Sequence, residues 1–401
     1  MAPTLSQPFA LRLQASLIFA FMAASSVPSP LYAIYRAEWG FSPATLTAVF
    51  AVYVFSLLGA LLTLAPLSDY LGRRPVVLGA IAVELLSMLL FLCADSVAVL
   101  VAARLVQGAA TGVALSVLGA GIADLDRQRA PLINSTAPLF GLGTGALGAS
   151  LLATYAPAPT RLVYLLLLVL LLVQGWLAWR LPETVSRKRG ALHSMRPRLA
   201  VAPGARRDFL RVMPLDIAVW ALGGYLLSLG PTLARQITGE RSAVVGGLML
   251  AALTGSGAAG SLLLRARSAA TLMRLGSAAL AAGVGLVLVS TFTASAGVFF
   301  LGIVVAGVGF GVGFLAALRT VMASVLPEQR ASLMAALLVL SYCAFSLPAL
   351  AAGVAVTHFG LVATSQVYGA LVMALALVAL LGTRSRSAQV PARACSGPGV
   401  G

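Results

Sequence analysis

The sequence predicts an all-α membrane protein in which twelve transmembrane helices form two six-helix halves. Of its 401 residues, 60% are hydrophobic and only 9% are charged, which lies outside the usual range of soluble domains. Several apolar runs approach the roughly 20 residues that a helix needs to cross a ~30 Å hydrocarbon core. The second half of the chain also repeats features of the first, which indicates an internal duplication.

The apolar segments are the elements we expect to be helical. They begin at about residues 13, 45, 76, 97, 132, 162, 214, 243, 272, 296, 332 and 361. The first segment follows Arg12 and continues to about Tyr35 without a clean cleavage site, so we interpret it as a span and not as a signal peptide. An even number of spans places both termini on the same side of the membrane.

The distribution of Lys and Arg predicts which side that is. Nearly all of the 27 basic residues fall in loops on the side of the termini. The exceptions are Arg36, Arg161, Arg235 and Arg241 on the other side, and Arg104 within a span. By the positive-inside rule both termini are cytoplasmic, in a multi-pass protein of the inner membrane. The net charge of +16 therefore reflects topology and does not indicate nucleic-acid binding.

A basic, polar interval predicts the boundary between the halves. Residues 182–212 form a cytoplasmic linker between an N-terminal half, 1–181, and a C-terminal half, 213–383, and residues 384–401 form a disordered tail. An ungapped offset of 201 places Pro30 on Pro231 and the tripeptide 128–130 on 329–331. Parallel halves suit a carrier whose site lies between them. The linker is a topology determinant, or else a binding surface for anionic lipid headgroups.

Residues for other classes of chemistry are scarce. Cys93, Cys343 and Cys395 match no metal or disulfide framework. His193 and His358 are the only histidines, and no Walker sequence occurs. We therefore expect neither an enzyme nor a protein with a cofactor or metal.

The stretch LSDYLGRRP, residues 67–75, concentrates charge in the short cytoplasmic loop between segments two and three. Asp69 and Arg73 are close enough to pair if the loop is helical. Arg73 and Arg74 by themselves are also ordinary topology anchors. Acids contribute little to topology, so Asp69 suggests a specific partner, such as the positive N-terminus of another helix.

Two charges lie inside spans. Arg104 is ~10 Å deep in segment four and Glu84 ~12 Å from the cytoplasmic end of segment three. Segments three and four are antiparallel, so the two side chains reach similar depths and can pair. Glu84 is then either a static acid, ion-paired or hydrogen-bonded, or a carboxyl that takes up and releases protons. Arg104, Gln107 and Thr111 share one helix face.

These motifs resemble those of the major facilitator superfamily. The loop is similar to the signature G-x-L-A-D-x-x-G-R-R, with Ala65 in place of the first Gly and with Leu67, Asp69, Gly72, Arg73 and Arg74 matching. RLVQGAATG, residues 104–112, resembles the signature R-x-x-Q-G-x-G-A-A. FGLGTGALGAS, residues 140–150, resembles the antiporter signature of segment five, in which Gly141, Gly143 and Gly145 remain and Ala146 stands at the Pro position.

The resemblance implies roles for these residues. Asp69, Gly72, Arg73 and Arg74 would form a conformational latch, in which Asp69 caps segment eleven near residues 328–331 and Arg73 pairs with acids. Arg104, with Gln107, is linked to proton coupling. The altered segment-five signature weakens the case for antiport, and its small residues also suit ordinary helix packing.

Small, aromatic and weakly polar side chains are candidates for a substrate cavity between the halves. They are Ser25, Ser29, Tyr32, Thr111, Trp220, Gly224, Ser228, Phe310 and Phe314. With Arg104 as the only charge, this lining predicts apolar or amphiphilic substrates of low charge. GVGFGVGF, residues 307–314, lies inside segment ten and is expected to be a close-packing helix, not a nucleotide site.

The first functional hypothesis is a monomeric, proton-coupled exporter of small amphiphilic molecules, which resembles drug:proton antiporters and works in contact with membrane lipids. A second keeps the fold and makes the protein an importer or facilitator of a metabolite. A third hypothesis is a membrane enzyme or receptor without transport. The sequence has no catalytic cluster to support it, and it does not explain the internal duplication.

Overall fold

A computed structural model describes residues 5–191, 195, 201, 203–323 and 330–384, and every regular element in these ranges is a helix. The all-α prediction is thereby confirmed. The helices are α1 (Gln7–Ser26), α2 (Pro28–Trp39), α3 (Pro43–Thr63), η1 (Ala65–Leu67), α4 (Ser68–Leu71), α5 (Arg73–Leu92), α6 (Val97–Leu125), α7 (Ala130–Tyr155), α8 (Leu162–Ala178), η2 (Pro203–Ala205), α10 (Arg206–Ser228), α11 (Gly230–Thr238), α12 (Ala243–Leu263), α13 (Ala269–Thr293), α14 (Ala296–Met322), α15 (Arg330–Phe359) and α16 (Leu361–Arg384).

Eleven helical segments in the described ranges are long and apolar enough to cross a membrane. α8 is a shorter apolar helix of 17 residues, or about 26 Å at 1.5 Å per residue. Some of the eleven segments join two elements, such as α1 with α2 and α3 with α4. A twelfth crossing by α8, and with it the count of twelve, stays a prediction.

Most helix starts lie within about four residues of those expected from the sequence, with two clear differences. α1 begins at Gln7, about six residues before the expected start of segment one. α10 begins at Arg206, about eight residues before the expected start of segment seven. Basic side chains can extend a helix beyond the hydrocarbon core because their stems lie along apolar surface while their charges reach water. The helix therefore continues into the stretch expected to be linker. The tail expected at 384–401 lies outside the described residues, except for Arg384 at the end of α16.

A proline follows the first long helix of each half. α1 ends at Ser26 and α2 begins at Pro28, while α10 ends at Ser228 and α11 begins with Gly230 and Pro231. Proline lacks a backbone N–H and disturbs the preceding turn. Both breaks therefore belong to corresponding places in the two parts of the chain, as the repeat at an offset of 201 predicts.

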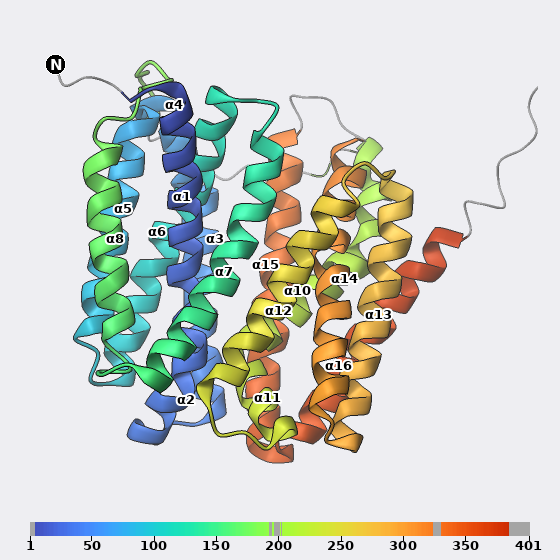
Figure 1. Ribbon diagram of the computed structural model, residues 1–401. Coiled ribbons are helices and arrows are strands. Elements are labelled where there is room, and N and C mark those ends of the chain that lie inside the picture. The colour runs from blue at the N-terminus through green and yellow to red at the C-terminus, as the bar shows by residue number, and fades with distance from the viewer. Residues whose placement is uncertain (1–4, 192–194, 196–200, 202, 324–329, 385–401) are drawn as a thin grey trace, which may run out of the picture.

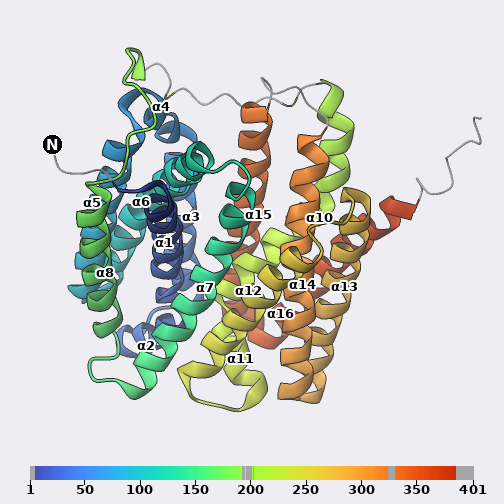
Figure 2. The same ribbon diagram turned by 45° about the horizontal axis from the view of Figure 1, so that its top comes forward.

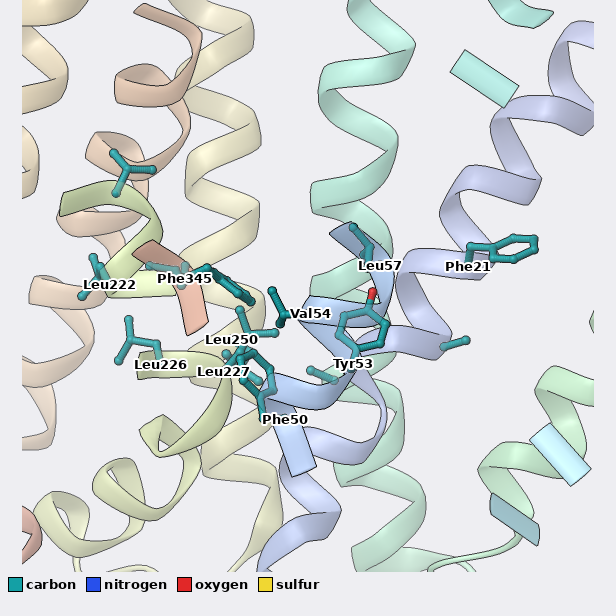
Figure 3. Packing of buried hydrophobic residues seen from close by; sticks show 14 of the residues in the cluster. Phe21, Phe50, Tyr53, Val54, Leu57, Leu222, Leu226, Leu227, Leu250 and Phe345 are labelled. Carbon is teal, nitrogen blue, oxygen red and sulfur yellow. The ribbon is translucent and has the colours of Figure 1, made fainter. Parts of the chain in front are cut away.

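The helices gather in two groups, α1–α8 and α10–α16, which lie side by side in both views (Figures 1 and 2). The groups meet along two helix pairs, α3 with α15 and α7 with α12. The rings of Phe50 and Phe345 lie 5.3 Å apart across the first pair, and Figure 3 shows Phe50, Val54, Phe345 and Leu250 gathered at this junction.

The close contacts at the junction concentrate toward one end of the bundle. Gly353 of α15 faces Thr47 in the first turns of α3, and Gly247 in the first turns of α12 faces Ser150 near the end of α7. Asp69 follows the opposite end of α3. The groups are therefore held together at the end remote from the Asp69 loop.

A disulfide between positions 47 and 353 tests this packing. A Cβ atom at position 353 would lie 2.8 Å from that of Thr47, so a small shift gives the ~3.8 Å typical of a disulfide. In a cysteine-free background with a protease site in the linker, we expect Thr47→Cys with Gly353→Cys to keep the cleaved halves joined on a non-reducing gel. Val354 is exposed, and Thr47→Cys with Val354→Cys is the control. Equal cross-linking of both pairs would contradict the packing.

Candidate functional site

Arg73 is the centre of a polar cluster at the start of α5. Its guanidinium forms the predicted ion pair with Asp69, at 2.6 Å, and a second one with Asp124 at the end of α6, at 3.1 Å. It also donates to the hydroxyl of Ser68 at 2.6 Å. Only 14% of the Arg73 side chain is exposed against 59% of that of Asp69. Isolated surface ion pairs contribute about 0–1 kcal/mol, so the strength of this cluster lies in the shared, half-buried arginine.

Gly72 allows the chain to enter α5. Its φ of 100° is in the region that favours glycine. A Cβ atom here would lie 2.5 Å from the carboxylate of Glu183. That carboxylate accepts hydrogen bonds from the backbone N–H groups of Arg73 at 2.7 Å and Arg74 at 3.1 Å. Glu183, from the chain after α8, therefore caps the positive N-terminus of α5.

The described partners of the Arg73 cluster all belong to the first group of helices. Asp69 is predicted to contact residues 328–331. Residues 328 and 329 lie outside the described ranges, so the cap on segment eleven stays a prediction. The start of the linker also joins the cluster, because the N–H of Lys188 donates to the carbonyl of Tyr70 at 2.8 Å.

Arg104 is the largest fully buried side chain. It donates to the Tyr32 hydroxyl at 2.7 Å, to the carbonyl of Ser25 at 2.9 Å and to the side-chain oxygen of Gln107 at 2.7 Å. Its guanidinium carbon also lies 5.0 Å from the ring centre of Tyr53, within the range of cation–π attraction. The first helix and its continuation α2 are thus tied to α6 through one charge.

Glu84 and Arg104 form no direct ion pair, so the possible pairing is corrected, and Glu84 is instead the hydrogen-bonded acid that the sequence also allows. Gln107 lies between them: its amide nitrogen donates to Glu84 at 3.2 Å and its oxygen accepts from Arg104. A glutamine can do this because its amide both donates and accepts. Equal depth along two helices brings the charges to one layer, and the side chain one turn after Arg104 fills the space between them.

Some polar atoms at this site have no hydrogen-bond partner among the described residues. They are one carboxylate oxygen of Glu84, one terminal nitrogen of Arg104 and the hydroxyl of Ser29. Each buried and unpaired polar group costs about 1–3 kcal/mol. Such atoms are available to a proton or to a polar group of a ligand.

The remaining first-half candidates bond within their own helices. The hydroxyl of Ser25 donates to the carbonyl of Met22 at 2.8 Å, and that of Thr111 to the carbonyl of Gln107 at 2.9 Å. Ser25 also contributes its backbone carbonyl to Arg104. The hydroxyls of Ser25 and Thr111 both lie within reach of the hydroxyl of Tyr53, whose ring packs on Arg104.

The second-half candidates divide into an aromatic cluster and packing residues. The ring of Trp220 lies 5.3 Å from that of Phe314, and Phe310 packs against Gly223 of the same helix as Trp220. Phe310 and Phe314 therefore share one helix face, since both contact α10. Gly224 instead lies against the backbone of Phe345, and the Ser228 hydroxyl donates to the carbonyl of Gly224 at 2.7 Å.

The small residues of α7 serve packing on two sides. Gly141 and Gly145 face the backbone of α1 at Phe19 and Ala23, while Gly143 faces Thr254 of α12. The carbonyl of Ala146 lies against Gly247, also in α12. The segment-five motif therefore joins α1 to the junction between the two groups.

Three acids were not recognised in the sequence. Asp216 of α10 is fully buried and accepts a hydrogen bond from Ser341 of α15 at 2.8 Å. The available signal was that Asp216 precedes Trp220 by four residues. We did not recognise it because Asp216 lies close to the expected start of segment seven. Asp124 and Glu183 reach Arg73 from 51 and 110 residues away, and no local pattern marks them.

A known family of proteins matches most of the chain, including the Asp69 loop and the Arg104 network. Residues 15–347 match the family model described as Major Facilitator Superfamily. The chain belongs to this superfamily. Members of it are multi-pass membrane transporters of small molecules, not enzymes. Their signatures account for the Asp69 loop and for Arg104.

One curated relative is the cephamycin export protein CmcT of Amycolatopsis lactamdurans, 38% identical over 117 residues. This match covers 28% of the present chain and only 24% of the relative, about a quarter of its length.

Solved structures with the same fold cover nearly the whole chain. A bacterial homologue of the human lysosomal transporter Spinster, in an inward-facing conformation, has a TM-score of 0.76 at 14% identity and covers 94% of this chain and 97% of its own. The xylose transporter XylE of E. coli, in a partially occluded inward-open conformation, has a TM-score of 0.72 at 15% identity, with 96% and 98% covered. The human organic anion transporter MFSD10 has a TM-score of 0.66 at 19% identity, with 94% and 100% covered. These likenesses concern the fold.

Replacing Gln107 tests the bridge. Gln107→Leu leaves Glu84 and one Arg104 nitrogen without their partner, at about 1–3 kcal/mol for each stranded group. We expect a clear fall in the thermal unfolding temperature in detergent. Thr320→Val, which removes a hydroxyl that donates to the carbonyl of Ala316 in its own helix α14 at 2.8 Å, is the control and should lower it far less. Equal losses would contradict the bridge.

Replacing Gly72 tests the turn into α5. We expect Gly72→Ala to destabilise the protein, because its φ of 100° with ψ of 154° lies in a region open essentially only to glycine, at a cost of about 1–3 kcal/mol for other residues, and the added Cβ meets Glu183. Gly79 lies in α5, and a Cβ atom added there would have no other heavy atom within 4 Å, so Gly79→Ala should be neutral or stabilising. Unfolding temperatures that shift in the same direction for both variants would refute the role of Gly72.

Proposed function

We propose that the protein exports small amphiphilic molecules across the inner membrane in exchange for protons. The proposal is carried by one observation, the fully buried chain Glu84–Gln107–Arg104 with an unpartnered carboxylate oxygen. The partial match to an export protein supports the direction of transport. The substrate, the coupling ion and the direction are all parts of this proposal.

The proton acts through the charge balance of the buried network. With Glu84 ionised, its negative charge offsets Arg104 through Gln107. With Glu84 protonated, the positive charge of Arg104 is unbalanced in a region where charges are costly. The network contacts α1, α2, α5 and α6, so each protonation state favours a different arrangement of these helices. A two-state carrier needs only such a difference in interaction energy to shift its populations.

Alternating access then moves the two halves, residues 1–181 and 213–383, against each other. We propose that the termini and the Asp69 loop are cytoplasmic. The junction contacts at the remote end would then close the outer side, as in an inward-facing state. In the opposite state, Asp69 would reach segment eleven and the Arg73 cluster would act as the latch. α8 would supply the twelfth span, the linker would contact anionic lipids, and the protein would work as a monomer.

A facilitator or importer is the second candidate. It is favoured by Ala146 at the proline position of segment five and by the packing role of Gly141, Gly143 and Gly145, since packing needs no antiport.

Proton exchange is measured in everted vesicles with an imposed pH gradient and a pH-sensitive dye. On addition of amphiphilic compounds, wild type should release protons, while Glu84→Gln and Arg104→Ala should not. Asp69→Asn should slow release because it weakens the latch. Asp95, an exposed acid after α5, supplies the control Asp95→Asn, which should behave as wild type. Movement of compounds by wild type without proton release would reject antiport and favour the facilitator.

A further inference from the structure

Asp216 is a second buried carboxyl, in the opposite half from Glu84. It lies ten residues into α10, about 15 Å along the helix, and has no exposed surface. One oxygen accepts from the hydroxyl of Ser341 at 2.8 Å, and the indole N–H of Trp220, which has no other partner among the described residues, lies within reach of the carboxyl. A carboxyl at this depth needs a partner for its charge, and neither Ser341 nor Trp220 supplies a positive charge.

The cations of neighbouring helices whose side chains the structure describes are engaged elsewhere or point to the surface. No Lys, Arg or His nitrogen of the described residues lies within 4 Å of the Asp216 carboxylate. Arg211 on the same helix pairs with Asp208 at 3.5 Å. Arg319 of α14 donates to the carbonyl of Arg265 at 2.8 Å, and Arg274 of α13 is exposed. The charge of Asp216 is therefore left for a ligand from outside the chain.

Aromatic rings surround the next turn of the same helix. Trp220 follows Asp216 by four residues, which places both on one helix face. Its ring lies 5.1 Å from that of Tyr342, 5.3 Å from that of Phe314 and 5.6 Å from that of Phe345. Phe345 in turn reaches Phe50 of the other half (Figure 3). The cluster thus extends from Asp216 to the junction where the halves meet.

We propose that Asp216 and the Trp220 cluster, formed by Trp220, Phe314, Tyr342 and Phe345, are a subsite for the protonated amine of an amphiphilic molecule. The proposal rests on the proposed function and names its substrate class. A carboxylate supplies the counter-charge, and aromatic faces attract organic cations while covering an apolar body. If Asp216 bound only a proton, the aromatic rings around it would not be required. This changes the expected lining, in which Arg104 was the only charge, and favours substrates with one positive amine.

Binding of three shape-matched probes tests the subsite in the full chain reconstituted in lipid nanodiscs. They are 4-phenylbutylamine, its trimethylammonium derivative and its neutral N-acetyl derivative, measured by isothermal titration calorimetry. We expect Asp216→Asn to weaken binding of both cations at least tenfold and to change binding of the neutral probe less than twofold. Asp216→Glu should retain part of the cation affinity, and Asp95→Asn all of it.

Three outcomes would overturn the subsite. They are unchanged cation affinity in Asp216→Asn, an equal loss for all three probes, and a wild type that binds the neutral probe as tightly as the cations. If Asp216→Asn does not fold, Asp216→Glu and Trp220→Leu replace it, and each must lower cation affinity more than neutral affinity. Proton exchange in vesicles is scored separately. Its absence from wild type, with amine binding still dependent on Asp216, would reject the antiport and keep the subsite.

Discussion

The structure depends on how a membrane-embedded arginine is kept from lipid. A charge in the centre of a span costs about 2.5–3.5 kcal/mol on insertion scales, and Arg104 has no exposed surface at all. Its partners come from three segments: a hydroxyl from α2, a carbonyl from α1 and an amide from its own helix. The first half is therefore assembled around one cation, and the break between α1 and α2 places Ser25 and Tyr32 on either side of it.

Each half buries a charged side chain inside the membrane-spanning bundle, and the two charges have opposite signs. The first buries a cation with a carboxyl one glutamine away, and the second buries a carboxyl with a serine and, among the described residues, no cation. In our proposals, an amphiphilic amine supplies the missing counter-charge for Asp216 in the second half. A proton binds to Glu84 in the first. Both sites adjoin the helices that form the junction, since α3 supplies Tyr53 to Arg104 and Phe50 to Phe345. Charge at either site can therefore influence how the halves fit together.

Sequence reasoning succeeded where one helix or one loop determines the result. The common face of Arg104 and Gln107 follows from helical periodicity, and the pair Asp69–Arg73 from a spacing of four. It failed where the answer depends on which side chains from different helices fill one space. Helix depth aligned Glu84 with Arg104 but could not reveal the glutamine between them. Asp216 resembled a charge at a helix boundary only because the preceding residues, from Arg206, were not expected to be helical.

The central claim is that Glu84 carries the proton that is exchanged for substrate. Infrared difference spectroscopy of the reconstituted protein follows the C=O stretch of protonated carboxyl groups directly, and Asp216→Glu, which keeps a carboxyl at the proposed amine subsite but alters its band, distinguishes the other buried acid from Glu84. The account predicts that an amphiphilic compound reduces this band, and that Glu84→Gln abolishes the change. A band that does not respond to the compound, or that responds equally in Glu84→Gln, would contradict it.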